Sequence, residues 1–137
     1  MAGPVRLPVV CAVIERPGAV LVAQRPPHKH LPLQWEFPGG KVEADETPEA
    51  ALRREIFEEL SCTLADLVPL TVTEHDYGAV RIRMTAFVAS LEAGSPEPSP
   101  REHVAVRWLS PDDLRRVELA AADQPVVQAY LQRRTAR

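Results

Sequence analysis

The chain has 137 residues, of which 45% are hydrophobic and 26% are charged, as expected for one folded globular domain over residues 1–137. Its 19 acidic and 16 basic side chains give a formal net charge of −3, which argues against a nucleic-acid-binding surface because such surfaces carry a basic excess. Its apolar runs are too short for a membrane span or for the apolar part of a signal peptide, so we expect neither.

The segments before residue 47 predict short strands and loops. Two β-rich runs, 9–14 and 19–24, flank the turn sequence RPG at 16–18 and predict a hairpin. Residues 25–34 contain three prolines and predict a loop. The next segment, WEFPGGK at 35–41, predicts a short strand followed by a glycine loop, whose backbone can approach a ligand closely and expose its carbonyl groups.

A helix is predicted from residue 48 onward. Thr47 can serve as its N-cap, and Pro48 then falls at the first helical position, where the missing N–H costs nothing. Leu52, Ile56 and Leu60 recur at i, i+4 and i+8, and this spacing predicts an apolar stripe that is buried.

Three glutamates beside this stripe form a candidate cation site. Glu55, Glu58 and Glu59 stand at i, i+3 and i+4, so on a helix they lie within about 100° of one another. Carboxylates this close repel one another, and a hard divalent cation that also binds substrate phosphates would relieve the repulsion. Arg54, four residues before Glu58, can orient it as an ion pair. The alternative is a solvated acidic face, but the preceding glycine loop favours a metal and phosphate site.

The remaining elements are strands and helices in an order that predicts an α+β fold. Strands are predicted over 67–75, 79–91 and 104–109. In the second of these, inward residues at even positions from 80 to 86 alternate with outward residues that include Phe87. A loop over 93–100, a short helix from 110 and a final helix over 125–134 complete the prediction.

The segment GKVEADETPEAALRREIFEELSC at 40–62 resembles the Nudix box, the signature of hydrolases that cleave nucleoside diphosphates linked to another group. The matching positions are Gly40, Glu46, Arg54, Glu55, Glu58 and Glu59. Ser61 departs from the pattern, because the family usually has glycine just past the helix, where a left-handed residue is common. A serine that keeps that conformation is expected to cost about 1 kcal/mol.

The resemblance extends over nearly the whole chain and is closest to the MutT-like branch, through AQRP at 23–26, WLSPDDL at 108–114 and LAAADQPVVQAYL at 119–131. It implies an α/β/α sandwich with a mixed β-sheet between helices. It also implies an enzyme that uses Mg²⁺, or Mn²⁺ in its place, to hydrolyse a nucleoside triphosphate to a monophosphate and pyrophosphate. The branch includes 8-oxo-dGTP diphosphatases and enzymes for CTP or modified dCTP.

The resemblance also assigns roles to individual residues. Glu55, Glu58 and Glu59 match the metal-binding carboxylates, and the carbonyl group of Gly40 matches a backbone ligand. Glu102, six residues before a tryptophan, matches a loop glutamate that approaches the metals and serves as general base. An ordinary loop charge is the alternative for Glu102, and Glu55 is the competing candidate for the base.

Four further residues are candidates for nucleotide binding. Arg25 and Phe37 match positions that line the nucleotide pocket, although Phe37 could instead be a core residue. Lys41 would offset phosphate charge or remain solvated. Asp123 stands where the family reads the base, but it could also cap the following helix. An ionised Asp123 accepts hydrogen bonds only, so it would suit the donors of either cytosine or oxidised guanine.

Two other functions remain open. One is a Nudix hydrolase for a dinucleoside polyphosphate, ADP-ribose or a nucleotide sugar, a reading that Tyr77, fifteen residues past the box, slightly supports. The other is a non-catalytic Nudix-like nucleotide-binding module, against which the intact acidic positions argue. We expect a small nucleotide as the partner, no nucleic acid and no membrane, and either a monomer or a homodimer. Cys11 and Cys62 lack CxxC spacing and are expected as free thiols in the cytoplasm.

Overall fold

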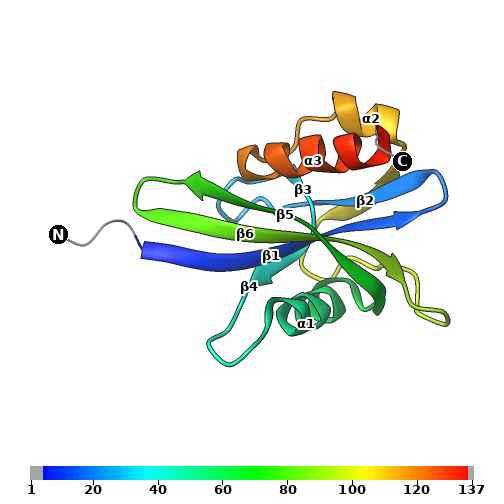
Figure 1. Ribbon diagram of the computed structural model, residues 1–137, viewed down its shortest axis with the longest axis horizontal. Coiled ribbons are helices and arrows are strands. Elements are labelled where there is room, and N and C mark those ends of the chain that lie inside the picture. The colour runs from blue at the N-terminus through cyan, green and yellow to red at the C-terminus, as the bar shows by residue number, and fades with distance from the viewer. Residues whose placement is uncertain (1–4, 136–137) are drawn as a thin grey trace.

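In residues 5–135, which the computed structural model describes, seven strands form one mixed β-sheet with helices on both faces (Figure 1). The ends of the predicted 1–137 domain lie outside this range. The strands are β1 Val5–Arg16, β2 Ala19–Gln24, β3 Trp35–Glu36, β4 Gly39–Lys41, β5 Leu64–Asp76, β6 Val80–Leu91 and β7 Ala105–Leu109. The helices are α1 Pro48–Leu60, α2 Pro111–Arg116 and α3 Gln124–Thr135, with a 3₁₀ turn, η1, at Ala121–Asp123.

The sheet is mixed because β1 and β6 run parallel, while the other strand pairs are antiparallel. The strand order is β3-β2-β1-β6-β5, with β4 paired to β1 and β7 paired to β2. Helix α1 covers one face, and α2 and α3 cover the other (Figure 1). The predicted α/β/α sandwich with a mixed sheet is therefore confirmed.

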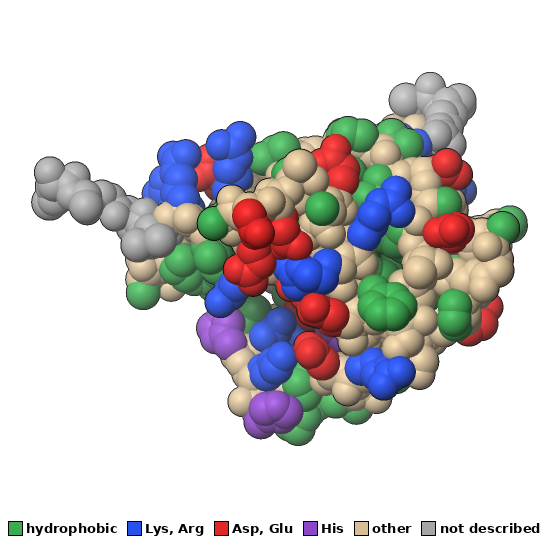
Figure 2. Space-filling view, turned by 90° about the horizontal axis from the view of Figure 1, so that it is seen from below, with side chains coloured by type: hydrophobic (Ala, Val, Ile, Leu, Met, Phe, Trp, Pro, Cys, Tyr) green, Lys and Arg blue, Asp and Glu red, His purple; other side chains and the backbone are tan. Residues whose placement is uncertain are grey.

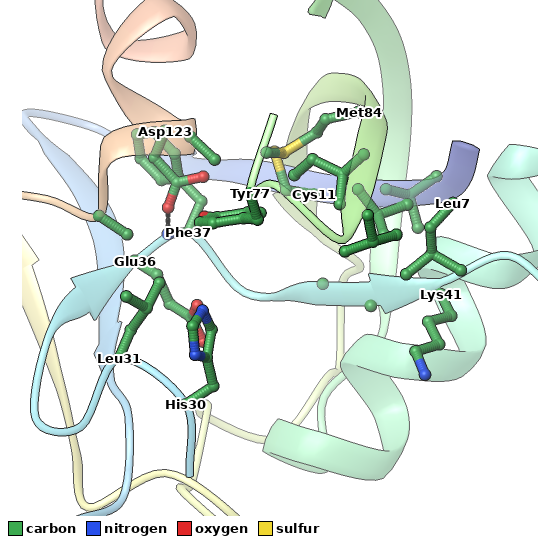
Figure 3. Close-up of a pocket in the computed structure, with 18 of the residues that line it drawn as sticks. Leu7, Cys11, His30, Leu31, Glu36, Phe37, Lys41, Tyr77, Met84 and Asp123 are labelled. Atoms are coloured by element: carbon green, nitrogen blue, oxygen red, sulfur yellow. Dashed lines mark hydrogen bonds between the residues drawn. The ribbon is translucent and has the colours of Figure 1, made fainter. Parts of the chain in front are cut away.

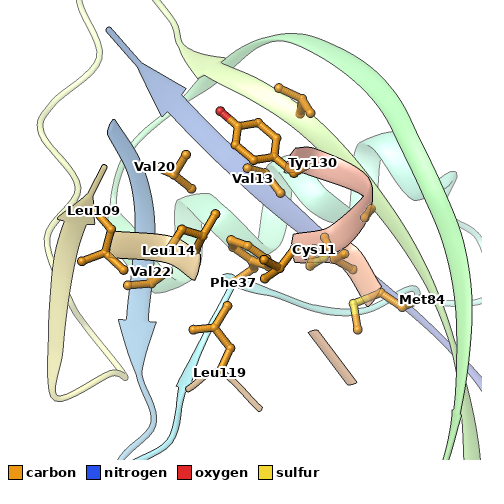
Figure 4. Close-up of a cluster of buried hydrophobic side chains, with 14 of the residues drawn as sticks. Cys11, Val13, Val20, Val22, Phe37, Met84, Leu109, Leu114, Leu119 and Tyr130 are labelled. Carbon is orange, nitrogen blue, oxygen red and sulfur yellow. The ribbon is translucent and has the colours of Figure 1, made fainter. Parts of the chain in front are cut away.

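The apolar run of β1 is buried on both faces of the sheet. Cys11 and Val13 point into the cluster under α2 and α3, where Tyr130 and Phe37 also pack (Figure 4). Alternate residues from position 10 to 14 point into the second cluster, against the apolar side of α1. A strand buried on both faces reads as a continuous apolar run, which explains the uninterrupted sequence VVCAVI.

Helix α1 forms as its local signals predict. The Thr47 Oγ1 atom accepts a hydrogen bond from the Ala50 N–H at 3.1 Å. The predicted stripe of Leu52, Ile56 and Leu60 is fully buried. Ser61 ends the helix in the left-handed conformation, with φ 55° and ψ 33°, so the turn keeps the shape that glycine usually provides.

Two sequence-based predictions about the sheet were wrong. Phe87 is buried against the α1 face rather than outward, because helices cover both faces of β6 from residue 86 to 89. Gly39 and Gly40 belong to β4, which pairs with β1, rather than to a loop. A Cβ atom on Gly39 would overlap the Val10 carbonyl oxygen, so this close approach of two strands requires glycine. None of the helices in residues 5–135 is long and apolar enough to cross a membrane.

Candidate active site

Two adjoining cavities open beside β4. The larger, of about 570 Å³, is mostly apolar, whereas the smaller, of about 320 Å³, is lined chiefly by charged groups. The residues that line both are Arg25, Glu36, Gly39, Gly40 and Lys41. Seen from the α1 side, acidic and basic side chains gather around a hollow in the surface (Figure 2). A ligand with an apolar part and a charged part would fit across this boundary.

The charged cavity lies where β4 passes over α1. It contains Glu55 and Glu59 from α1 and Glu102 from the loop between β6 and β7. A Cβ atom on Gly40 would overlap the Glu55 carboxylate, so glycine is needed here for the Glu55 carboxylate to pack directly against the β4 backbone. Glu58 does not line this cavity and has a side chain that is 54% exposed. The structure therefore brings together three of the four glutamates predicted as ligands.

Arg54 organises the carboxylates around this cavity. Its guanidinium donates two hydrogen bonds to Glu46, at 2.6 and 2.8 Å, and one to Glu55 at 2.9 Å. It also reaches Glu58 at 3.3 Å and the Lys41 carbonyl oxygen at 3.1 Å. The predicted ion pair with Glu58 is confirmed, although Glu46 is the closer partner. Arg54 holds the pKa of Glu46 low, at about 2, so this carboxylate remains a charged brace between helix and loop.

Glu59 is the most unusual carboxylate of the site. It is 5% exposed, and burial raises its pKa to about 9, with Glu55, Glu36 and Glu102 adding repulsion. Burial also raises the pKa of Glu55. The Glu59 Oε2 atom is buried without a hydrogen-bond partner among the described residues. The ionised form of a buried carboxylate with like charges around it is stable only when a cation lies beside it.

Glu102 occupies the open side of the cavity. Its side chain is 55% exposed, and its one ion pair among the described residues is a loose contact of 3.8 Å with Lys29. Both candidates for the general base, Glu55 and Glu102, thus lie on the wall of the same cavity.

Two residues of the site, Glu36 and His103, were not predicted from the sequence. The His103 side chain is only 5% exposed, and its Nε2 atom lies 3.0 Å from Glu36 Oε2 and 3.9 Å from Glu59 Oε1. Glu36 and His103 therefore connect β3 and the β6–β7 loop to the buried end of the carboxylate row. The position of His103 directly after Glu102 was the available sequence signal, but nothing local indicated that its side chain turns inward.

The apolar cavity holds the predicted nucleotide-binding residues. Figure 3 shows Phe37, Tyr77 and Asp123 grouped at one end and Lys41 at the other. Phe37 is 3% exposed and belongs both to the core and to the cavity wall, so neither reading excludes the other. Arg25 donates to the His30 carbonyl oxygen at 2.6 Å and to Glu36 at 3.1 Å.

Lys41 lines both cavities and is exposed, which leaves its solvated and phosphate-binding readings open. Asp123 is 5% exposed and accepts a hydrogen bond from the Phe37 N–H at 3.1 Å. Within residues 5–135 it makes no side-chain hydrogen bond to the first turn of α3, so the alternative reading as a helix cap was wrong.

The sequence of the NUDIX domain matches residues 5–130 of this chain. The chain belongs to the NUDIX family. Its named relatives are hydrolases, and this NUDIX protein is a hydrolase as well.

Three similar proteins show how far the family likeness extends. A CTP pyrophosphohydrolase of Escherichia coli (strain K12) is 37% identical over 134 residues, which cover 94% of each chain. An 8-oxo-dGTP diphosphatase of Proteus vulgaris is 38% identical over 82 residues, covering 60% of this chain and 70% of its own. A DNA mismatch repair protein MutT of methicillin-resistant Staphylococcus aureus 252 is 40% identical, with 92% of this chain and 95% of its own covered and a TM-score of 0.74.

NUDIX hydrolases use a divalent metal ion and act on small nucleotide substrates. The charged cavity fits such an ion, since Glu59 Oε2 is buried without a partner among the described residues and the Glu55 carboxylate lies against the Gly40 backbone, which places two kinds of oxygen ligand side by side. Among the described residues, however, no three His, Cys, Asp or Glu side chains converge closely enough to enclose a metal. Arg54 instead holds Glu55 and Glu58 in ion pairs. The assignment of individual metal ligands in this NUDIX protein therefore stays a prediction.

In this NUDIX protein, Asp123 in the wall of the apolar cavity is expected to make the stability of the fold depend on pH. Burial, followed by repulsion from Glu36, raises the pKa of Asp123 from 3.8 to about 7. The resulting contribution to stability is complete below pH 3.8 and is lost as the pH rises through 7. Asp123→Asn keeps an acceptor for Phe37 but cannot ionise. We expect it to be more stable than the wild type at pH 8, on the order of a few kcal/mol, and equally stable at pH 4.

Denaturant unfolding at a series of pH values measures this difference. Asp112→Asn, at an exposed position on α2, is the control and should follow the wild type throughout. A stability gap for Asp123→Asn that stays the same from pH 4 to pH 8 would contradict the prediction.

Proposed function

We propose that this protein is a nucleoside triphosphate pyrophosphohydrolase that converts a nucleoside triphosphate and water to the monophosphate and pyrophosphate. The observation that carries the proposal is the junction of an apolar cavity with a carboxylate-lined cavity across β4. A base and sugar suit the first cavity, and a metal-bound triphosphate suits the second. The NUDIX relatives named for CTP and for 8-oxo-dGTP support the same reaction.

The base is proposed to be cytosine or an oxidised or modified base such as 8-oxoguanine. Asp123 supports this choice, because a buried carboxylate facing the apolar cavity offers acceptors to the amino group of cytosine or to the N1–H and N2–H₂ edge of a guanine. Hydrolysis of a damaged deoxynucleoside triphosphate removes it before a polymerase can use it. We therefore propose that the protein cleans the nucleotide pool and so limits damage to DNA.

Mg²⁺ is the proposed metal, with Mn²⁺ able to substitute for it. The groups that would hold it are the Gly40 carbonyl group and the carboxylates of Glu55, Glu58, Glu59 and Glu102. When bound, such an ion neutralises phosphate oxygens and acidifies a water molecule.

The other steps belong to side chains of the protein. Either Glu55 or Glu102 takes the proton of the attacking water, since both line the charged cavity. Arg54 fixes the orientation of Glu55 through its hydrogen bond of 2.9 Å. Lys41 and Arg25 line both cavities, where their positive charges offset the negative charges of the phosphates.

The cellular setting is also a proposal. Cys11 and Cys62 are buried and free, which suits a reducing compartment, and we propose the cytoplasm. We further propose one domain over residues 1–137 that works as a monomer or a homodimer.

A panel of nucleotides incubated with Mg²⁺ tests the reaction. The panel contains 8-oxo-dGTP, dGTP, CTP, dCTP, 5-methyl-dCTP, ADP-ribose and a diadenosine polyphosphate, and phosphate is measured with and without inorganic pyrophosphatase. We expect phosphate from a preferred triphosphate only when pyrophosphatase is present, because the primary product is pyrophosphate. Turnover of ADP-ribose or the dinucleotide alone, followed by chromatography of the products because hydrolysis of ADP-ribose releases no free phosphate, would identify a NUDIX hydrolase for another diphosphate. Binding of nucleotides without turnover of any of them would identify a binding module.

A further inference from the structure

The loop between β6 and β7 is attached to the C-terminal end of α1. The Ser99 N–H donates to the Leu60 carbonyl oxygen at 2.8 Å, and the Arg101 N–H donates to the Glu59 carbonyl oxygen at 2.9 Å. A third bond joins side chains, because Arg101 Nε donates to Ser61 Oγ at 2.6 Å. The helix that carries the buried carboxylate therefore also holds the loop that crosses its end.

Ser61 is the position at which this chain departs from the family pattern. Its φ of 55° lies in the left-handed region, where serine is less favourable than glycine. Its backbone N–H still closes the last turn of α1 by donating to the Phe57 carbonyl oxygen at 3.0 Å. Glycine could make that bond without strain, so the one thing that serine adds is the hydroxyl group that accepts from Arg101.

Glu102 lies between two anchored residues of this loop. Arg101, before it, is bonded to the end of α1, and His103, after it, is bonded to Glu36 at 3.0 Å. Glu102 itself is 55% exposed and makes only the loose contact with Lys29. The contacts of the Glu102 side chain therefore do little to hold it in place. Its position at the charged cavity depends on the bonds that Arg101 and His103 make on either side of it.

We propose that Ser61 and Arg101 are positioning residues that hold Glu102 at the charged cavity. Serine is less favourable than glycine in this left-handed conformation, but its hydroxyl group gives a hydrogen bond that attaches the β6–β7 loop to α1. This inference rests on the proposed function, in which Glu102 acts on the metal or on the attacking water.

Ser61→Gly is the first test, since it removes the tether and relieves the left-handed strain. We expect kcat to fall about three- to tenfold, as for the loss of one charge-assisted hydrogen bond, with KM and the melting temperature nearly unchanged. Arg101→Gln should lower kcat to a similar extent. Ser99→Gly is the matched control in the same loop, because glycine keeps the main-chain bond to Leu60, and it should retain full kcat.

A double-mutant cycle with Glu102→Gln decides whether the effect passes through Glu102. We expect Ser61→Gly to lower kcat in the wild type and to change nothing further in the Glu102→Gln background. Ser61→Ala, which removes the hydroxyl group but keeps a side chain, should give the same result.

The cycle also distinguishes the proposed role of Glu102 from the proposed positioning role of Ser61. If Glu102→Gln retains full kcat, the proposed role of Glu102 fails. If Glu102→Gln lowers kcat while Ser61→Gly and Ser61→Ala do not, only the positioning proposal is overturned. A loss in Ser61→Gly that is equally large in the Glu102→Gln background would overturn it as well, because the serine would then act through α1 alone.

Discussion

Replacement of Glu58 by glutamine is expected to remove most of the turnover and leave the protein folded. The Glu58 side chain is 54% exposed, and its contact of 3.3 Å with Arg54 is a surface ion pair. Its loss should therefore cost less than about 1 kcal/mol of stability. If the carboxylate helps to hold the metal, kcat with Mg²⁺ should fall by about 100-fold or more.

Steady-state kinetics and thermal unfolding on the same preparation check this result. Glu49→Gln is the matched control, because Glu49 is an exposed glutamate on the same helix and lies outside both cavities. It should retain nearly full turnover. Near-normal turnover of Glu58→Gln with Mg²⁺ would refute the assignment of Glu58 to the metal site.

Replacement of Glu59 by glutamine is expected to stabilise the metal-free protein while it abolishes activity. The pKa of Glu59 is raised from 4.5 to about 9 in the folded state. Its contribution to stability is therefore complete below pH 4.5 and is lost as the pH rises through 9. At pH 8 the metal-free folded wild type still holds the Glu59 proton, whereas the unfolded chain has released it, so ionisation favours unfolding; glutamine ionises in neither state. The gain should be on the order of a few kcal/mol.

A divalent metal should reverse the order of the two proteins. At 100 times its dissociation constant, a ligand that binds only the folded state adds about 2.7 kcal/mol. The wild type should gain this stabilisation from Mg²⁺, whereas Glu59→Gln should gain much less. Unfolding in EDTA and in Mg²⁺ at pH 5 and pH 8 gives the comparison, and it does not depend on turnover. Equal stabilisation of both proteins by Mg²⁺ would show that Glu59 takes no part in metal binding.

Asp123 titrates in the same direction, with a pKa of about 7, so the metal-free wild type should lose stability from both groups as the pH rises. The difference between wild type and Glu59→Gln isolates the second group, because Asp123 is present in both proteins. Combining Asp123→Asn with Glu59→Gln should remove most of the pH dependence above pH 5, since the two sites are then both neutral.

The sequence by itself determined the features that depend on spacing along one element. Thr47 and Pro48 predicted where α1 begins, and the stripe that includes Leu52 predicted its buried side. The row of Glu55, Glu58 and Glu59 followed from the same periodicity. A helix fixes the relative directions of residues three and four apart, so these relations hold before any tertiary contact forms.

Only the tertiary structure decided how the members of that row differ. Periodicity made the three glutamates equivalent, but the packing of β4 and the β6–β7 loop over α1 buried Glu59 and left Glu58 exposed. The inward turn of His103 toward Glu36, 67 residues away, and the bond between Arg101 and Ser61, 40 residues away, likewise depend on which segments meet in space.

The same distinction explains the wrong predictions. Phe87 and Gly39 were placed by local alternation and by the turn preference of glycine. In the folded protein, helix α1 covers the face of β6 that carries Phe87 and buries it, and β4 pairs with β1 so closely that Gly39 must lack a side chain. Local sequence sets the direction of a side chain relative to its own element. Burial, electrostatic environment and contact partners are set by the neighbouring elements, and only the tertiary structure brings those neighbours together.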